Sequence, residues 1–262
     1  MKRFFKDLSK YWNYIVFQAK AELKVEIINS YLGWIWLFLE PLCFMLIYTF
    51  IAGVVFGSKT QYFPVFVFSA LTLWNFFSKA LTASVKAVNK NKEIVTKVYV
   101  PKFVLLIVII LVNLFKLFIS FGLVLVFMII YQIPISLNVL WIIPIILCLV
   151  LVTFGFGCIF MHFGVLMDDL VNLTNIGLRF VFYLSGIFYD INTKVPEKYR
   201  GILLIGNPMA LLIDGFRKGL MYCSSPNLIG LGIWLMIGLL LSTYGIHLIY
   251  KYENTYVKVM RG

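Results

Sequence analysis

The sequence predicts an all-α integral membrane protein with six transmembrane helices, an N-terminal amphipathic interface helix and re-entrant outer helices before the sixth span. Composition is the first reason: 62% of the 262 residues are hydrophobic and 13% are charged, whereas soluble domains are nearer half apolar and a quarter charged. The second reason is several apolar stretches of about 20 residues, the length with which a helix crosses a bilayer and satisfies its own backbone hydrogen bonds. Both observations exclude a soluble globular protein.

The N-terminal segment, residues 1–30, predicts an amphipathic helix from Ser9 to Ile28. Its apolar positions recur at helical spacing and charged residues fill the opposite face. The apolar positions are Trp12, Ile15, Val16, Ala19, Leu23 and Ile27. Such a helix lies in the headgroup layer of a membrane, although a helix on a protein surface has the same pattern. The first long apolar run begins near Leu32, so no cleaved signal peptide is expected.

Six spans are expected within a transmembrane domain of residues 31–252. The first five run from about Leu32 to Phe56, Pro64 to Ser84, Phe103 to Tyr131, Leu140 to Leu166 and Val171 to Tyr189, and the sixth follows Asn227 and ends near Tyr250. A tail of residues 253–262 completes the chain.

Two segments between the spans differ in composition from simple polar loops. Residues 86–102 are basic, and residues 192–222 contain apolar runs at Ile202–Ile205 and Met209–Ile213 that are broken before Pro208. Proline disfavours helix in the residue before it and suits a first helical turn. We expect two short helices that dip into the outer leaflet, with a surface helical hairpin as the alternative.

The distribution of Lys and Arg sets the expected orientation. The majority lie in the N-terminal segment, in residues 86–102 and in the tail. Positive residues near spans are retained on the cytoplasmic side, so both termini are expected in the cytoplasm. The net charge of +12 is explained by this membrane orientation, and no nucleic-acid partner is expected.

Neither a catalytic nor a metal site is expected. The stretch Gly53–Thr60 resembles a phosphate-binding loop but has Ser58 where that motif needs glycine before lysine. Asp168 and Asp169 are adjacent, so on a helix their carboxylates point apart, and a solvated turn is the simpler interpretation. A membrane-embedded polyprenyl-phosphate transferase using them is the alternative. The remaining candidates are scattered: Cys43, Cys148, Cys158, Cys223, His162 and His247.

Three charges fall inside expected spans: Glu40, Lys116 and Arg179. Charge in hydrocarbon is costly unless it is paired or hydrated, so each is a candidate functional residue. The simplest structural alternative is an ion pair of Glu40 with Lys116 or Arg179. Lys79 lies near the end of its span and is expected to snorkel.

The fifth span has a polar stripe, because Asn172, Asn175, Arg179, Tyr183 and Gly186 recur every three or four residues. Aromatic residues are also frequent on the first and fifth spans, and their faces can stack on sugar rings that slide past, which suits movement of a long glycan. The stripe predicts either a wet conduit or a buried structural pair. The candidate conduit residues are Trp34, Glu40, Tyr48, Lys116, Asn175, Arg179 and Tyr183.

Four motifs occur in order along nearly the whole chain. They are the amphipathic N-terminal helix, Ser30-Tyr-Leu-Gly33 with Trp36 and Pro41-Leu42, the loop Asn89–Lys102 with Glu93-Ile94, Lys97-Val98 and Pro101-Lys102, and Asn207-Pro208 with Arg217. This arrangement resembles the permease subunits of type-2 ABC exporters that move lipid-linked polysaccharide, O-antigen or teichoic acid. Asp168 and Gly186 depart from the family pattern, which often has arginine and proline there.

The resemblance implies a homodimer in the cytoplasmic membrane, surrounded by lipid, with two copies of a separate ATPase subunit that binds ATP and Mg. This chain itself then binds no cofactor and exports a polyprenyl-pyrophosphate-linked glycan. The implied ATPase-coupling residues are Asn89, Lys92, Glu93, Lys97, Tyr99, Pro101 and Asp169, and the implied outer-gate residues are Asn207, Pro208 and Arg217. A drug or lipid exporter of the same class is the alternative.

Overall fold

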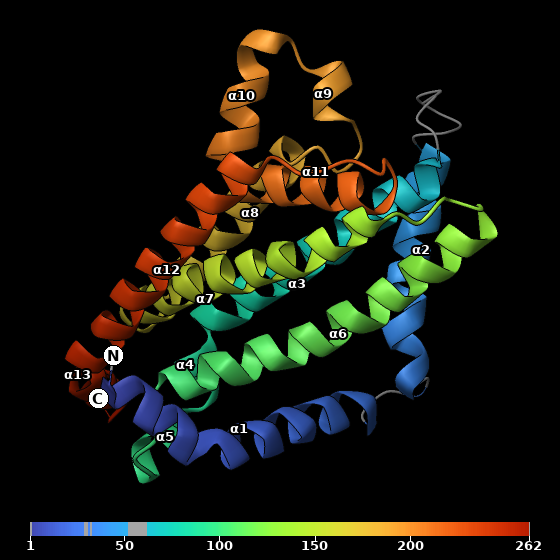
Figure 1. Ribbon diagram of the computed structural model, residues 1–262. Helices are drawn as coiled ribbons and strands as arrows, with labels where there is room; N and C mark the ends of the chain where they lie inside the picture. The colour runs from blue at the N-terminus through green and yellow to red at the C-terminus, as the bar shows by residue number, and fades with distance from the viewer. Residues whose placement is uncertain (1, 29–30, 32, 52–61, 262) are drawn as a thin grey trace.

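The computed structural model describes residues 2–28, 31, 33–51 and 62–261, and within these ranges every regular element is a helix (Figure 1). The longer helices are α1 (Lys2–Ile28), α2 (Trp36–Phe50), α3 (Phe63–Val85), α6 (Phe103–Ile130), α7 (Ile142–Leu166), α8 (Leu170–Leu184), α10 (Glu197–Gly206), α11 (Pro208–Leu220), α12 (Leu228–Lys251) and α13 (Glu253–Arg261). The short ones are η1 (Gly33–Ile35), α4 (Ala87–Lys90), α5 (Lys92–Lys97), η3 (Leu137–Trp141) and α9 (Ile191–Lys194).

Four helical segments of the described chain are long and apolar enough to cross a bilayer: α3, α6, α7 together with η3, and α12. The all-α membrane architecture is therefore confirmed. Helices α2 and α8 stand where the first and fifth spans are expected and are apolar, but each has 15 residues. At 1.5 Å per residue that is about 22 Å, less than the ~30 Å hydrocarbon core. The count of six spans stays a prediction.

Helices α8 and α2 differ from the fifth and first expected spans at different ends. Helix α8 stops at Leu184, before the expected end at Tyr189, because Gly186 has a φ of +66° in the left-handed region that ends helices. Helix α2 begins at Trp36, after a 3-10 turn that starts at Gly33. The expected end of the first span at Phe56 lies outside the described residues.

Helix α3 is the centre of the bundle. Most of its side chains are buried, and it packs against α2, α6, α7, α8 and α11. The most extensive helix pair is α7 with α12, where glycine allows the backbones to approach closely. A Cβ placed on Gly245 would collide with Cys158 Cβ, and one on Gly155 would lie 2.6 Å from Leu241 Cβ.

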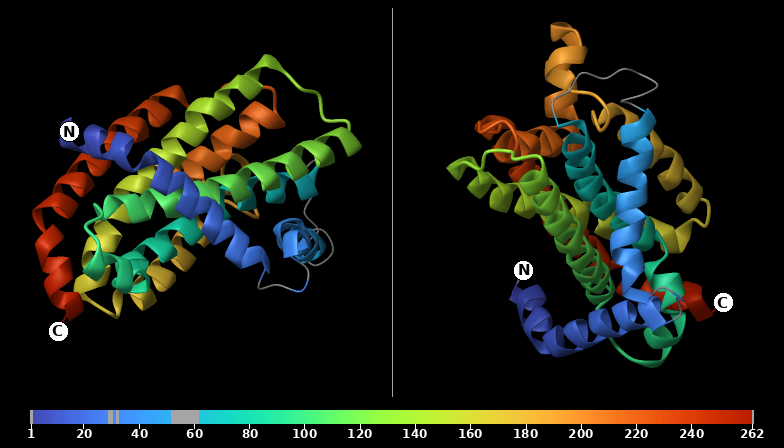
Figure 2. Two further views of the ribbon diagram at one scale, coloured as in Figure 1. Left: turned by 90° about the horizontal axis from the view of Figure 1, so that it is seen from below. Right: turned by 90° about the vertical axis from the view of Figure 1, so that its right-hand side faces the viewer.

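Helix α1 runs along the foot of the bundle against α6 (Figure 2). Its predicted apolar side is only partly internal, because Ile15 and Ala19 are buried while Trp12 is 46% exposed. The helix begins at Lys2 rather than Ser9, and the Ile27 side chain lies outside the described residues. The amphipathic helix is thus present, and its place in the headgroup layer stays a prediction.

The expected outer helices are present as parts of α10 and α11. Asn207 separates them, and its Oδ1 accepts a 3.0 Å hydrogen bond from Met209 N while Pro208 occupies the first turn of α11. Helix α11 lies against α3 and is largely buried, whereas α10 has no buried residue and projects from the bundle at the top of Figure 1. How deeply they enter a leaflet stays a prediction.

Candidate functional site

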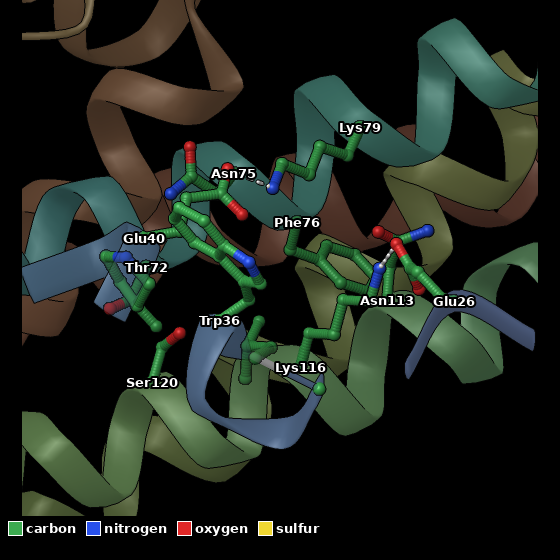
Figure 3. Close-up of a pocket in the computed structure, with 13 residues that line it drawn as sticks. Glu26, Trp36, Glu40, Thr72, Asn75, Phe76, Lys79, Asn113, Lys116 and Ser120 are labelled. Atoms are coloured by element: carbon green, nitrogen blue, oxygen red, sulfur yellow. Dashed lines mark hydrogen bonds and ion pairs between the residues drawn. The ribbon is translucent and has the colours of Figure 1, made fainter. Parts of the chain in front are cut away.

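A polar cavity of about 100 Å³ lies among η1, α2, α3 and α6 and is closed on one side by the end of α1 (Figure 3). It is lined by Glu26, Gly33, Trp36, Glu40, Pro41, Thr72, Asn75, Phe76, Lys79, Asn113, Lys116, Leu117 and Ser120. A water occupies ~30 Å³ and needs two to four polar partners. This cavity is polar and large enough to be hydrated, which lowers the cost of its charges.

Two ion pairs cross the polar cavity. Lys79 Nζ on α3 lies 2.7 Å from Glu40 Oε1 on α2, and Lys116 Nζ on α6 lies 2.6 Å from Glu26 Oε1 on α1. The structural alternative, a pair of Glu40 with Lys116 or Arg179, is therefore not the pairing that the described residues form. Because α1 runs beneath α6, its last turn brings Glu26 to Lys116, while Lys79 reaches Glu40.

A wider basic groove of about 900 Å³ lies between α3 and α8. Its lining residues are Trp74, Ser78, Lys79, Thr82, Ala83, Lys86, Asn175, Leu178, Arg179, Phe182 and Tyr183. Three of these are cations and none is acidic. Arg179 has no carboxylate within ion-pair distance in the described part of the chain. The basic groove therefore attracts anions.

A third cavity, the vestibule, has about 650 Å³ and lies between α1, the C-terminal end of α3 and the first half of α6. Lys79, Lys86, Lys90 and Lys116 line it, together with Glu22 and Glu26 among other residues. Lys79 borders all three spaces, and Lys86 borders both the vestibule and the basic groove. Lys79 is consequently the residue that all three spaces share, and together they form a polar region that reaches from the foot of the bundle to the middle of α8.

Aromatic rings join the first and fifth expected spans. The ring centroid of Tyr48 on α2 lies 4.6 Å from that of Phe188, Phe188 lies 5.3 Å from Phe182 on α8, and Phe182 lies 5.3 Å from Trp74 on α3. Offset and tilted ring pairs at these separations are attractive. This cluster lies beside the basic groove, which Trp74 and Phe182 also line.

The structure therefore collects most predicted conduit residues around Lys79. Glu40 and Lys116 line the polar cavity, and Asn175, Arg179 and Tyr183 line the basic groove. Tyr48 belongs to the aromatic cluster, and the side chain of Trp34 lies outside the described residues.

Sequence reasoning missed six polar residues of the polar cavity: Glu26, Thr72, Asn75, Lys79 as a lining residue, Asn113 and Ser120. A signal existed on α3, where Thr72, Asn75 and Lys79 recur at helical spacing and so share one face. Glu26 gave no such signal, because its role depends on where α1 packs.

An apolar groove of about 500 Å³ runs along the other side of α8, towards α7. It is lined by Phe77, Leu81, Phe156, Phe160, Leu170, Leu173, Thr174, Gly177, Leu178, Val181, Leu184, Gly206, Asn207 and Pro208. Leu178 borders both this space and the basic groove. Helix α8 thus has a polar side and an apolar side.

The predicted coupling residues form an exposed surface around α4 and α5. Asn89, Lys92, Glu93 and Lys97 are all exposed, as is Tyr99 after α5. Asp169 is exposed in the turn between α7 and α8. Pro101 differs, because it is buried, and its carbonyl accepts a hydrogen bond from Val104 N at the start of α6.

The predicted outer-gate residues tie α11 to the end of α8. Buried Arg217 donates from Nη1 to Gly186 O at 2.8 Å, from Nη2 to Ile187 O at 2.8 Å, and from Nε and Nη2 to Phe66 O at 3.1 and 3.0 Å. Asn207 Nδ2 donates to Ser185 Oγ at 3.0 Å. Arg217 is thus an internal tie and presents no guanidinium to the cavities described above.

No group of three or more His, Cys, Asp or Glu that could hold a metal ion occurs among the described residues. The cavities instead combine paired charges, unpaired cations and aromatic rings. Such an arrangement can hold and pass an anionic, amphipathic molecule.

Comparison with known proteins agrees with this architecture. The chain is 26% identical to two O-antigen export system permease proteins RfbA from Klebsiella pneumoniae, over 255 residues that cover 97% of each chain. It is 29% identical over 219 residues to the O-antigen export system permease protein RfbA of Myxococcus xanthus, covering 83% of this chain and 84% of that one. Residues 17–221 match the family model described as ABC-2 type transporter. The chain therefore belongs to the ABC-2 type transporter family.

Proposed function

We propose that this chain is the transmembrane permease subunit of an ATP-driven exporter that carries a lipid-linked polysaccharide of the O-antigen or teichoic acid kind to the outer face of the cytoplasmic membrane. In this proposal the chain crosses the membrane six times with both termini inside. Two copies form the pathway and bind two ATPase subunits. The full-length similarity to O-antigen export permeases supports the class of substrate.

The observation that carries the proposal is the position of Arg179 and Asn175 on α8. Both are exposed on the isolated chain and line the basic groove. A guanidinium facing acyl chains costs several kcal/mol. Helix α8 therefore faces a second copy or a hydrated passage, and a homodimer with a conduit between its halves provides both.

The cations of the basic groove suit a diphosphate head. Lys86 and Arg179 line the groove without a carboxylate at ion-pair distance among the described residues, and Lys79, which is paired with Glu40, lines it as well. Ionised hydrogen bonds from such groups to phosphate oxygens are among the stronger ones in proteins. Sugar rings then pass over Tyr48, Tyr183 and the rest of the aromatic cluster, whose flat faces bind sugars without deep wells.

Energy enters from the ATPase subunits, which hold ATP and Mg. The exposed surface of α4 and α5, together with Asp169 in the second cytoplasmic turn, supplies the docking residues. Closure of the ATPase dimer then moves these short helices as rigid bodies.

The test is reconstitution in liposomes with the ATPase subunit and a polyprenyl-diphosphate-linked glycan. We expect outward movement of the glycan only when ATP and both subunits are present, and mass analysis of copurified lipid should find a polyprenyl-linked sugar. Movement by the permease alone would refute the ATP-driven mechanism. Glycan transfer lost in an Asp168→Asn, Asp169→Asn double variant, with no vectorial movement in the wild type, would support the transferase alternative.

A further inference from the structure

The short helix α5 is supported by the C-terminal helix α13. Helix α5 has six residues, and Val95 is the one buried among them. A helix of this length is not stable by itself in water. It packs against α13, so α13 fixes the orientation of the surface that carries Lys92, Glu93 and Lys97.

Helix α13 is in turn attached to the transmembrane bundle. Tyr256 is completely buried, and its hydroxyl shares a 2.8 Å hydrogen bond with Nδ1 of His162 near the end of α7. The His162 ring also lies 4.8 Å from the ring of Tyr252 at the end of α12. Burial raises the pKa of the Tyr256 hydroxyl, so the hydroxyl stays protonated and neutral in this contact. Tyr256 thereby joins α13 to α7, and the His162 ring connects this contact to the end of α12.

A second joint surrounds Arg3 at the start of α1. Its Nη2 donates to the Tyr99 hydroxyl at 2.8 Å and lies 3.4 Å from Glu253 Oε2 of α13. Its guanidinium lies 4.4 Å from the ring centroid of Tyr250 on α12, and the Tyr250 hydroxyl donates to Asp7 Oδ2 at 2.7 Å. Because the Arg3 side chain is 59% exposed, each ion pair adds little stability. The joint instead fixes where the segment after α5 meets α1, α12 and α13.

Besides the Arg3 joint and the packing of α4 against α7, two connections lead from α5 into the bundle. One route follows the chain into α3 and α6, through the turns around Asn91 and the extended segment at Val98. The other crosses from α5 to α13 and reaches α7 and α12 through Tyr256 and His162. Packed side chains and rigid helices can carry coupling between distant sites, and the second route consists of such contacts.

We propose that α13 is a brace that passes the displacement of α5 to α7 and α12, with Tyr256 as its principal positioning residue. The inference rests on the proposed function only in taking α5 as the docking site of the ATPase. It assigns no substrate contact to Tyr256. Loss of the brace leaves docking of the ATPase intact and lowers the amount of glycan exported per ATP hydrolysed.

The test uses the complete complex of permease and ATPase in liposomes and compares Tyr256→Ala, Tyr256→Phe and Asn254→Ala. Asn254 is exposed on the same helix and is the matched control. Two quantities are measured: the affinity of the ATPase subunit for the permease, and the glycan exported per ATP hydrolysed. If Tyr256 had only a structural role, the variants would lower the amount of assembled complex but not the glycan exported per ATP hydrolysed.

For Tyr256→Ala we expect an affinity within about twofold of the wild type and export per ATP reduced about fivefold or more, as for a coupling change of ~1 kcal/mol. Tyr256→Phe retains the ring and loses the hydrogen bond, so its reduction should be smaller, and Asn254→Ala should match the wild type. Unchanged export per ATP in Tyr256→Ala would overturn the proposal. So would an affinity of the ATPase subunit for the permease that falls by the same factor as export per ATP.

If the Tyr256→Ala permease fails to assemble with the ATPase, the variants Tyr256→Phe and Glu253→Gln test the proposal instead. Unchanged export per ATP in both would overturn the proposal. A wild-type permease that neither binds nor stimulates the ATPase would instead refute the proposed function, so the two failures are distinguishable.

Discussion

The ammonium of Lys116 on α6 lies 2.6 Å from the carboxylate of Glu26 on α1. This pair connects the helix at the foot of the bundle to the middle of an expected span. The pair also separates the polar cavity from the vestibule, because both residues line both spaces. A movement of α1 that separates this pair therefore removes the counter-charge of Lys116 and changes the connection between the two cavities.

Glu26→Gln should destabilise the protein by ~1–3 kcal/mol, because the ammonium of Lys116, whose side chain is 22% exposed, loses its counter-charge. The double variant with Lys116→Gln should recover part of that loss. Thermal unfolding of the four proteins in a double-mutant cycle measures the coupling. Glu22→Gln, one turn earlier in α1, is the control, and strictly additive effects at positions 26 and 116 would contradict the pair.

Exchanging the charges of Glu40 and Lys79 separates stability from transport. The double variant Glu40→Lys, Lys79→Glu retains an ion pair between α2 and α3, so its unfolding temperature should stay close to that of the wild type. Export should nevertheless fall about tenfold, or ~1.4 kcal/mol, because a carboxylate then borders the basic groove in place of an ammonium. Wild-type export by the exchanged protein would show that the pair is only structural.

Arg217→Lys should cost ~2–4 kcal/mol of stability. The planar guanidinium satisfies three backbone carbonyls at once, and lysine cannot reproduce that geometry. The measurement is the unfolding temperature of the purified permease, with Lys218→Arg in the same helix as the control. Equal unfolding temperatures for the two variants would contradict the role of Arg217 as a tie between α11 and the end of α8.

Gly245→Ala should separate α7 from α12 and cost ~1–3 kcal/mol, since the added Cβ meets Cys158 Cβ. Gly232 lies in the same helix and has nothing within 4 Å of an added Cβ, so Gly232→Ala is the matched control and should not destabilise. Unfolding in detergent compares the two. A Gly245→Ala variant as stable as Gly232→Ala would contradict the close packing of these helices.

Much of the fold was predictable because hydropathy and turn chemistry act locally. The starts of α3 and α6 fall within one residue of expectation, since Pro64 and Pro101 mark their beginnings. The early end of α8 was not predicted: glycine is the residue type that ends helices in this way, but the sequence alone does not show that Gly186 adopts the positive φ or that its carbonyl accepts a hydrogen bond from Arg217.

The charged residues of the candidate site were predictable, but the residues with which they form ion pairs were not. Intramembrane charge identified Glu40, Lys116 and Arg179, and the structure places each in a cavity wall. Their partners depend on how α1 and α2 pack, which no pattern within a single helix specifies. The pairs with Glu26 and Lys79 therefore emerged only from the three-dimensional arrangement.

The central claim is that the polar side of α8 borders water within the membrane, and cysteine labelling tests it most directly. In a background with Cys43, Cys148, Cys158 and Cys223 replaced, single cysteines are placed at Asn175, at Arg179 and, as the control, at Leu173 in the apolar groove. A charged, water-soluble thiol reagent applied to intact membranes should modify positions 175 and 179 and leave 173 unmodified. If 175 and 179 stay unmodified in a folded protein, α8 does not line a hydrated passage and the permeation account is wrong.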